Sequence, residues 1–145
     1  MNNLVSIITP TFNSSKFFER TFKSVINQTY TNWEWIIVDD CSTDNTINLI
    51  KNLIKNNNKI RLINLKKNKG PSYCRNKAIS LAKGRFLTFI DSDDLWSKKF
   101  LEEMVSFSIL NNYYFIYCSY YICNENFDKK RIFKITNFAD FKAIL

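Results

Sequence analysis

The 145-residue sequence contains no histidine, and it has only two glycines and two prolines. Without histidine, the serine–histidine and cysteine–histidine pairs of nucleophilic catalysis are excluded, and so is a zinc site that uses histidine. Because Gly70 and Gly84 are the only glycines, the chain cannot form a G-x-G-x-x-G turn or a glycine-rich P-loop. A phosphate ligand would therefore have to be held by side chains and a metal ion.

Cysteine is scarce and long apolar runs are lacking. The four cysteines, at positions 41, 74, 118 and 123, form no C-x-x-C pair, which favours free thiols in a reducing compartment. The longest apolar stretch, residues 113–123, is too short and too rich in tyrosine to span a bilayer. The first residues also lack the basic and apolar regions of a signal peptide. We therefore expect a cytoplasmic protein.

Acidic residues are in the minority, since 21 lysines and arginines face 13 aspartates and glutamates, a net charge of +8. A solvated lysine-rich surface is the simplest interpretation. Attraction to a nucleotide, a membrane surface or a nucleic acid stays open. Hydrophobic residues make up 46% of the chain, so the sequence predicts a folded domain with its own core rather than a disordered protein.

The sequence does contain a regular alternation of short apolar runs and amphipathic segments. The expected strands are residues 5–8, 33–38, 60–65 and 86–90, followed by 114–122 and 131–135. The expected helices begin at Ser14 or Ser15, at Ser42 or Thr43, at Ser72 (ending at Gly84), at Ser97, and near Asn137. This pattern predicts an α/β fold with a mostly parallel, Rossmann-like sheet and helices on both faces.

Three carboxylates, those of Asp91, Asp93 and Asp94, follow directly on the apolar run 86–90, which is typical of a buried strand. Such close like charges repel and raise one another's pKa unless a cation compensates. A divalent metal is the simplest compensation. Magnesium and similar ions take one or two protein carboxylates and leave room for substrate phosphates. The cluster therefore predicts a metal–diphosphate site.

Other polar residues also follow strands of the expected sheet. Pro10 and Thr11 follow the first strand, and Asp39 and Asp40 follow the second. Ligands of open parallel sheets bind beyond the carboxyl ends of the strands, where the strand order reverses. We therefore expect these residues to share one edge with the three carboxylates.

Taken in order, the motifs of the chain resemble the N-terminal part of a family 2 glycosyltransferase. This family has the GT-A fold of nucleotide-sugar-dependent inverting enzymes. The matching residues are VSIITPTFN (5–13), SVINQTY (24–30), WIIVDDCSTD (35–44), NKGP (68–71), RN (75–76), AKG (82–84) and FIDSDD (89–94). Each motif alone is weak, but their order and spacing are specific.

The resemblance implies a role for each matching site residue. Pro10 and Thr11 would line the pocket for the nucleotide base, and Asp40 would accept a hydrogen bond from the base, commonly uracil. Arg75 would lie near the nucleotide. Asp91 and Asp93 would form the D-x-D pair for Mn²⁺ or Mg²⁺, with Asp93 on the metal and Asp91 near the ribose or the metal.

The implied function is transfer of a sugar, with inversion, from a nucleotide-diphospho-sugar to a glycan or lipid-linked acceptor in polysaccharide biosynthesis. The donor would be a UDP-sugar. Residues 1–145 would form a single, C-terminally truncated GT-A domain, with the nucleotide-binding core in 1–110 and the start of the acceptor side in 111–145. A cytoplasmic location, with peripheral contact at the inner face of the membrane, fits such an acceptor.

Three site residues also have simpler interpretations. Asp39 is as well placed to cap a turn or pair with a lysine as to touch a ligand. Asp44 fits a position near a helix N-terminus, where the helix dipole stabilises negative charge. Arg75 could equally be an ordinary surface cation on a helix.

The sequence departs from the family in one respect, because the catalytic residue that would deprotonate the acceptor is not found. The later acidic residues, none in the family's base context, are Glu102, Glu103, Glu125, Asp128 and Asp140. A catalytically incomplete nucleotide-sugar binding module is therefore one alternative. A basic nucleic-acid-binding domain is another, but no recognition helix or interleaved basic and aromatic strand is evident, so we expect no nucleic-acid partner.

Overall fold

The computed structural model describes residues 3–124 and 128–133. The first four strands are β1 (Val5–Thr11), β2 (Trp33–Asp39), β3 (Ile60–Asn64) and β4 (Phe86–Phe89). The helices are α1 (Phe18–Ile26), α2 (Thr46–Ile54), α3 (Pro71–Ile79) and α4 (Phe100–Asn111), and β5 (Tyr120–Cys123) and β6 (Lys129–Phe133) follow them. The chain divides into two compact units, Met1–Ser106 and Phe107–Leu145.

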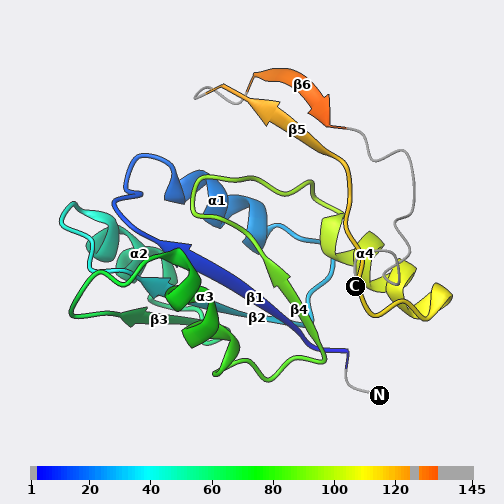
Figure 1. Ribbon diagram of the computed structural model, residues 1–145, viewed down its shortest axis with the longest axis horizontal. Helices are drawn as coiled ribbons and strands as arrows, with labels where there is room; N and C mark the ends of the chain where they lie inside the picture. Colours follow the sequence, from blue (N-terminus) through cyan, green and yellow to red (C-terminus); the bar gives the residue numbers. More distant parts are fainter. Residues whose placement is uncertain (1–2, 125–127, 134–145) are drawn as a thin grey trace. The chain divides into compact units, whose positions relative to one another are not determined.

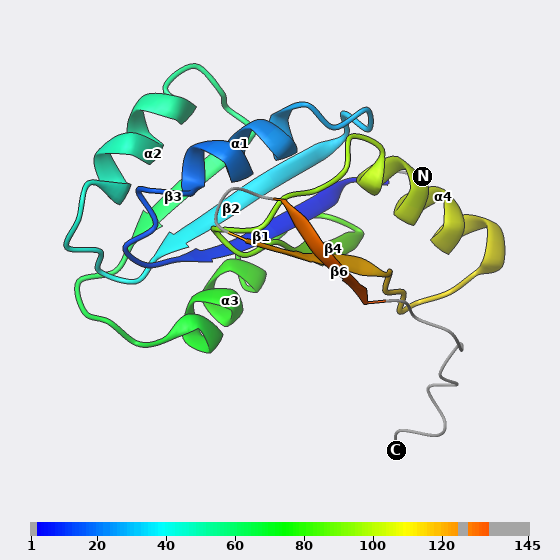
Figure 2. The same cartoon turned by 90° about the horizontal axis from the view of Figure 1, so that it is seen from above.

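The first unit is built on a parallel four-stranded sheet of order β3-β2-β1-β4 (Figure 1). Helices α1 and α2 cover one face of this sheet and α3 covers the other (Figure 2). This is the predicted Rossmann-like α/β arrangement. The strand order reverses at β1, because the chain first moves outward to β2 and β3 and then returns to place β4 on the other side of β1.

Strands β1 and β4 part early, which creates space at this reversal. Strand β1 pairs with β2 as far as Thr11 and Asp39, but it pairs with β4 only as far as Ile8 and Phe89. Pro10 lies beyond the last β1–β4 pair. Since proline has no N–H to donate to a neighbouring strand, its position suits a strand end where pairing on one side has stopped.

Two apolar clusters hold helices against the opposite faces of the sheet. On one face, the ring of Trp35 stacks on Phe18 and Phe22 of α1, with ring centroids 5.8 and 6.0 Å apart. On the other face, the small side chains Cys74 and Ala78 of α3 are fully buried against the sheet. Their small size lets α3 approach the sheet closely and brings its N-terminus near the end of β1.

The predicted side-chain caps of α1 and α2 are wrong. Helix α1 begins at Phe18 without a side-chain cap, and the hydroxyl of Ser14 instead hydrogen-bonds that of Ser92 at 2.7 Å. Helix α2 begins at Thr46, whose N–H donates to Asp44 at 2.9 Å. The hydroxyl of Ser42, one of the expected caps of α2, instead accepts the N–H of Asn13 at 2.9 Å.

Gly84 does not end α3 as predicted, since this helix ends at Ile79. A Cβ atom at Gly84 would lie 2.6 Å from the backbone nitrogen of Ser6 and 2.8 Å from the carbonyl oxygen of Leu4. The Gly84 N–H also donates to the Ser6 hydroxyl at 2.8 Å. A glycine is therefore required here because the chain entering β4 passes directly against the start of β1.

The apolar sequence of β4 predicted a buried strand, but part of this strand is exposed. Leu87 and Phe89 are 46% and 48% exposed, whereas Ile90 is 2% exposed. Phe89 pairs with Ile8 and so shares the face of the sheet that α3 covers. Helix α3 packs on β1 and β2, so this face of the edge strand β4 is left uncovered within the first unit.

The second unit contains an antiparallel pair of strands, β5 and β6. Strand β5 begins at Tyr120, later than the predicted start at residue 114. The helix expected from Asn137 lies outside the described residues. Within residues 3–124 and 128–133, we find no helix long and apolar enough to cross a membrane.

Candidate functional site

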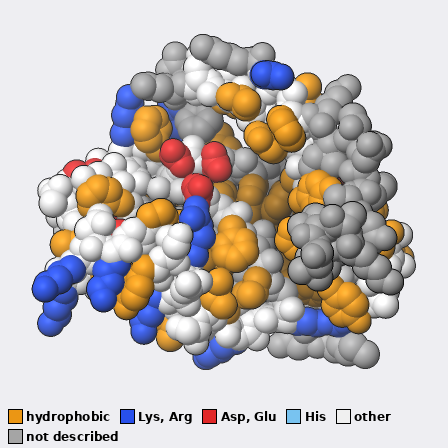
Figure 3. Space-filling view, in the orientation of Figure 1, with side chains coloured by type: hydrophobic (Ala, Val, Ile, Leu, Met, Phe, Trp, Pro, Cys, Tyr) orange, Lys and Arg blue, Asp and Glu red, His pale blue; other side chains and the backbone are white. Residues whose placement is uncertain are grey.

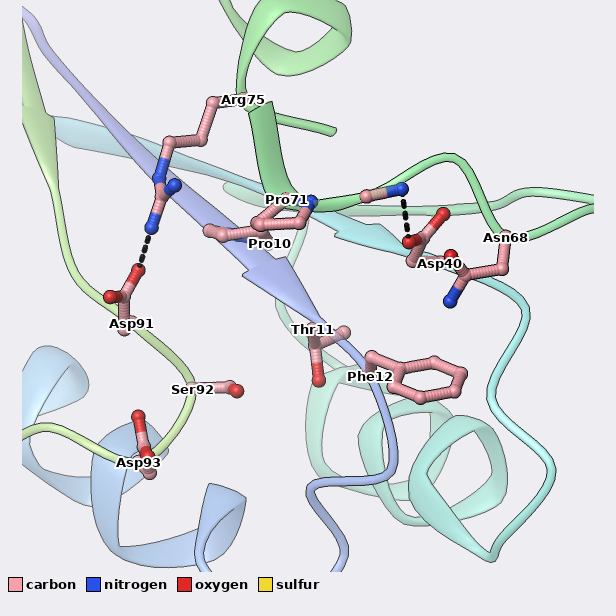
Figure 4. A pocket seen from close by; sticks show the side chains of 11 residues that line it. Pro10, Thr11, Phe12, Asp40, Asn68, Pro71, Arg75, Asp91, Ser92 and Asp93 are labelled. Carbon is pink, nitrogen blue, oxygen red and sulfur yellow. Dashed lines mark hydrogen bonds and ion pairs between the residues drawn. The ribbon is translucent and has the colours of Figure 1, made fainter. Parts of the chain in front are cut away.

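A pocket of about 350 Å³ lies beyond the carboxyl ends of β1 and β4, at the reversal of strand order. Its lining residues come from four segments of the chain (Figure 4). They are Pro10, Thr11, Phe12, Asp40, Asn68, Gly70, Pro71, Arg75, Asp91, Ser92 and Asp93. The structure thus brings together all six residues that the sequence placed in the nucleotide and metal site.

Arg75 and Asp91 face one another across the pocket (Figure 4). A guanidinium nitrogen of Arg75, on α3, lies 2.6 Å from a carboxylate oxygen of Asp91, in the loop after β4. Charge-assisted contacts of this kind are directional and stronger than neutral hydrogen bonds. Arg75 is therefore not an isolated surface cation. It places positive charge beside the loop formed by residues 91–94, the acidic loop.

Asp40 organises the loop that forms the opposite end of the pocket. It is 3% exposed, and its two carboxylate oxygens accept the backbone N–H groups of Lys69 and Gly70, each at 2.7 Å. Gly70 has a φ of 85°, which suits glycine. Since each carboxylate oxygen has two lone pairs, Asp40 retains acceptor capacity for a ligand.

Cys74 lies below this end of the pocket. Burial raises the pKa of its thiol to about 11, and the neighbouring Asp40 carboxylate contributes in the same direction. The thiol is therefore uncharged at neutral pH. Cys41, Cys74, Cys118 and Cys123 are all free of disulfides, as the sequence predicted.

Asp39 caps a turn rather than lining the pocket. It is fully buried and accepts hydrogen bonds from the backbone N–H and the hydroxyl of Ser42. The turn between them contains Cys41 at a φ of 65°. The turn-capping interpretation of Asp39 is therefore the one that the structure supports.

Asp44 stands at the N-terminus of α2, in agreement with its simpler interpretation. Burial tends to raise its pKa, but hydrogen bonds from Thr46 and Ser15 outweigh burial and lower the pKa to about 2. The carboxylate therefore stays charged at neutral pH. Its bond to the Ser15 N–H at 3.2 Å also ties the loop after β1 to the start of α2.

The acidic loop after β4 carries uncompensated negative charge. Asp94 is exposed as a residue, but partial desolvation of its carboxyl group raises its pKa, and the neighbouring charges of Asp93 and Asp91 raise the pKa further. Figure 3 shows acidic side chains grouped on the visible face, with a basic side chain directly beside them. Among the described residues, no hydrogen bond or ion pair holds the exposed carboxylate of Asp93. Asp93 is therefore available to a cation from outside the chain.

The donor set at this end of the pocket suits a hard divalent ion. Asp91 and Asp93 offer carboxylate oxygens, and the described residues contain no group of three or more cysteine and acidic side chains arranged to hold a metal. Magnesium and related ions typically bind through one or two carboxylates, and substrate phosphates complete the coordination. The residues thus fit a metal that binds together with a phosphate ligand.

One buried polar atom in the pocket wall has no partner. Thr11 is 2% exposed, and its hydroxyl oxygen is the single buried side-chain N or O atom without a hydrogen bond in the described part of the chain. Buried polar groups without partners are uncommon in folded proteins. A polar ligand or a water molecule bound at the end of β1 would give the Thr11 hydroxyl a hydrogen-bond partner.

None of the later acidic residues that the structure describes lines the pocket. Glu102 accepts a hydrogen bond from the Thr29 hydroxyl at 2.7 Å, and Asp128 is bonded to Asn124. Glu103 is exposed on α4 and does not line the pocket. Glu125 and Asp140 lie outside the described residues. Among described side chains, the carboxylates that line the pocket are those of Asp40, Asp91 and Asp93.

Several pocket residues were not assigned a role from the sequence. These are Phe12, Asn68, Gly70, Pro71 and Ser92. All of them lie inside motifs that carried the family resemblance, so their position in those motifs was the available signal. Phe12 is 48% exposed, which leaves an aromatic ring at the rim on the Asp40 side (Figure 4).

Comparison with known proteins identifies the family of this chain. The sequence profile described as "Glycosyl transferase family 2" matches residues 6–143. The chain belongs to glycosyl transferase family 2. It is 41% identical over 117 residues to the putative teichuronic acid biosynthesis glycosyltransferase TuaG of Bacillus subtilis, covering 81% of this chain and 46% of TuaG.

A second relative of the family 2 chain acts on a lipid-linked substrate, as its name states. It is the Escherichia coli UDP-Glc:alpha-D-GlcNAc-diphosphoundecaprenol beta-1,3-glucosyltransferase WfgD, 42% identical over 123 residues, covering 85% of this chain and 48% of WfgD. The chain thus spans about half the length of these curated relatives.

Solved structures of the GT-A fold also match the family 2 chain. S. aureus TarS 1–349 in complex with UDP superposes with a TM-score of 0.70 at 33% identity, covering 74% of this chain and 32% of that TarS chain. The mannosyltransferase PcManGT of Pyrobaculum calidifontis, in complex with GDP-Man and Mn²⁺, gives a TM-score of 0.68 at 25% identity. The match covers 72% of this chain and 32% of the PcManGT chain. The predicted GT-A fold is therefore confirmed.

Proposed function

We propose that this chain forms the donor-binding part of an inverting, metal-assisted glycosyltransferase that uses a UDP-sugar. The observation that carries the proposal is the pocket at the β1–β4 divergence, with Asp40 at one end and Arg75, Asp91 and Asp93 at the other. A nucleoside diphosphate has matching chemistry, since its base offers hydrogen-bond donors and its diphosphate carries negative charge. The UDP complex of TarS supports this choice of ligand.

The nucleoside end of the site is built around Asp40, Thr11 and Phe12. In the proposed complex, a remaining lone pair of Asp40 accepts an N–H of the base. Pro10 and Thr11 line the base pocket at the end of β1, and the exposed ring of Phe12 offers an apolar surface beside it. A carboxylate that is already held by two backbone N–H groups is well ordered for this task.

The diphosphate end is built around Arg75, Asp91 and Asp93. Asp93, with Asp91, would hold the divalent ion, for which the Mn²⁺ complex of PcManGT is the supporting precedent. When bound, Mn²⁺ or Mg²⁺ would supply Lewis-acid neutralisation of charge on the departing diphosphate. Arg75 holds Asp91 in position and places its own positive charge next to the phosphates.

The acceptor is proposed to be a glycan or a lipid-linked sugar, which fits the name of WfgD. Such an acceptor places the reaction at the cytoplasmic face of a membrane, with the basic surface of the chain in peripheral contact. The residue that deprotonates the acceptor for inverting attack is not among the described pocket residues. The relatives are about twice as long as the matched region.

Calorimetric titration with UDP, with and without Mn²⁺, tests this proposal. We expect binding with Mn²⁺ and at least about tenfold weaker binding without it, because the phosphates and carboxylates would otherwise repel. GDP should bind more weakly than UDP if the pocket is built for uracil. Equal UDP affinity with and without Mn²⁺ would contradict the metal assignment, and a preference for GDP would contradict the donor.

A donor-binding module without transfer activity is the second candidate, favoured by the lack of a further carboxylate in the described pocket. Incubation with radiolabelled UDP-sugar, Mn²⁺ and a lipid-linked acceptor separates the two candidates. Product formation would establish a transferase. Metal-dependent UDP binding without product or donor hydrolysis would establish a binding module, since loss of a general base typically costs about 10²–10⁴ in rate.

Replacing Asp40 by asparagine should weaken the binding of uridine as well as UDP. The amide can accept at one position only, and its NH₂ group would face one of the two N–H donors, of Lys69 or Gly70, that Asp40 now satisfies. We expect a loss of about tenfold in uridine affinity, corresponding to one charge-assisted hydrogen bond. Unchanged uridine affinity in calorimetry would remove Asp40 from the base pocket.

A further inference from the structure

Helix α1 and the turn that follows it carry three polar residues that the proposed function leaves without a role. Thr21 and Ser24 lie three residues apart on the helix, and Gln28 lies just beyond its last residue, Ile26. Two of them, Thr21 and Gln28, are 0% and 5% exposed. Buried polar side chains on a helix are unusual unless they have specific partners, so these contacts need an explanation.

All three side chains hydrogen-bond the backbone of one segment, residues 92–101, which runs from the acidic loop to α4. The Ser24 hydroxyl accepts the N–H of Trp96 at 3.3 Å. The Gln28 amide donates to the Ser97 carbonyl at 2.7 Å and accepts the N–H of Leu101 at 3.0 Å. Helix α1 and the turn after it thus hold the main chain of this segment.

Thr21 contacts the acidic loop itself. The Thr21 hydroxyl donates to the carbonyl oxygen of Ser92 at 3.0 Å, in a buried position. That carbonyl belongs to the peptide bond between Ser92 and Asp93. Because a peptide group is planar, holding its oxygen restricts the orientation of the backbone from which the Asp93 side chain departs.

Ser92 is held by its side chain as well. Its hydroxyl hydrogen-bonds that of Ser14, in the loop after β1, at 2.7 Å. The two polar groups therefore join Ser92 to two separate segments, α1 through Thr21 and the end of β1 through Ser14. On either side of this anchored residue lie the pocket carboxylates of Asp91 and Asp93.

We infer that Thr21 is a positioning residue for the metal-binding loop: its hydroxyl, together with that of Ser14, holds Ser92 so that Asp91 and Asp93 point into the donor pocket. The inference rests on the proposed function for the identity of the ligand. Outer-shell partners of metal-binding side chains commonly alter affinity by about 10–100-fold when removed. Neither Thr21 nor Ser14 lines the pocket, so the effect would be transmitted through Ser92.

Three variants of the 145-residue chain test the inference. Thr21→Val removes the hydroxyl at nearly constant volume, and Thr21→Ser keeps the hydroxyl. Thr9→Val is the matched control, since Thr9 is also fully buried and its hydroxyl accepts the Trp35 indole N–H at 2.9 Å, away from the acidic loop. If Thr21→Val does not fold, Ser14→Ala removes the other anchor of Ser92 and takes its place.

The first measurement needs no ligand. Hydrogen exchange followed by NMR reports the amide of Asp94, which donates to the Asp91 carbonyl at 3.2 Å in the turn of the loop. We expect at least about fivefold faster exchange of Asp94 in Thr21→Val. Thr21→Ser and Thr9→Val should exchange within twofold of wild type. Unchanged exchange at Asp94 in Thr21→Val would overturn the inference.

The second measurement is calorimetric binding of UDP with Mn²⁺, compared with uridine alone. Thr21→Val should weaken Mn²⁺-dependent UDP binding by about tenfold and leave uridine binding unchanged, and Thr21→Ser should restore UDP binding. Equal losses in Thr9→Val would mean general destabilisation and would overturn the inference. If the wild-type chain bound no UDP, the proposed function would fail, while exchange at Asp94 would still decide the positioning role.

Discussion

Replacing Asp93 by asparagine is expected to abolish Mn²⁺-dependent binding of UDP. The change removes a negative charge from the one pocket carboxylate that no described residue holds by a hydrogen bond or ion pair. A neutral amide is a much poorer ligand for a hard divalent ion. We expect at least about a hundredfold loss of UDP affinity in the presence of Mn²⁺, since even outer-shell changes cost about 10–100-fold. Isothermal calorimetry measures this directly.

Asp94→Asn is the matched control for this experiment. It removes the same charge from the next residue, which does not line the pocket, and UDP affinity should stay within about threefold of wild type. Both variants should fold, because Asp93 and Asp94 are exposed. Undiminished Mn²⁺-dependent binding in Asp93→Asn would show that the metal assignment is wrong. A comparable loss in both variants would mean that overall charge, rather than coordination by Asp93, is responsible.

Replacing Gln28 by leucine is expected to destabilise the fold by about 2 kcal/mol. Leucine removes both side-chain contacts that the buried amide makes with α4 and the segment before it. The Ser97 carbonyl still accepts the Phe100 N–H, but the buried Leu101 N–H loses its partner, which costs about 1–3 kcal/mol. Part of this loss is offset by the added apolar volume. Urea unfolding followed by circular dichroism gives the free energy of unfolding.

The control for Gln28 is an exposed amide on helix α2. Asn48 of α2 donates to the Asn45 side chain at 3.2 Å on the surface, and Asn48→Leu should change the free energy of unfolding by no more than about 0.5 kcal/mol. A loss below about 1 kcal/mol in Gln28→Leu would indicate that α4 is held by its apolar contacts alone. Leu101 and Val105 of α4 are buried in the core and provide that alternative attachment.

The alternation of strands and helices could be predicted from the sequence because it depends on local patterns. Apolar runs such as residues 35–38 are too short for helices and too apolar for loops, and the helices between them show apolar residues at helical spacing. The order of these elements then allows few arrangements besides a parallel sheet. The GT-A fold followed from these patterns together with the family motifs.

The residues that form the site could also be predicted, because the topology alone brings the strand ends to one edge of the sheet. Pro10 lies near the end of β1, Asp40 and Asp91 come after the ends of β2 and β4, and all three line the pocket. Arg75 was ambiguous, since a helical cation can face solvent or a carboxylate. Its 2.6 Å contact with Asp91 depends on how closely α3 packs on the sheet, and sequence spacing does not report that distance.

The caps and the exposure of β4 could not be predicted, because they depend on distant partners. Ser14 has the chemistry of a helix cap, but its hydroxyl bonds Ser92, which is 78 residues away in the chain. Leu87 and Phe89 have the composition of a buried strand, but β4 lies at the edge of the sheet, and the helix on their face packs on β1 and β2. In both cases the local preference was overridden by a contact, or the lack of one, that only tertiary structure defines.

The sequence by itself determined the α/β alternation, the family, and the set of residues that meet at the sheet edge. These properties depend on residue type, periodicity and chain order, which are all local. The tertiary structure decided which carboxylates already have a hydrogen-bond or ion-pair partner. Asp39 and Asp40 accept backbone N–H groups and Asp91 pairs with Arg75. The carboxylate of Asp93 stays open to a cation, because no neighbouring donor in the described chain reaches it.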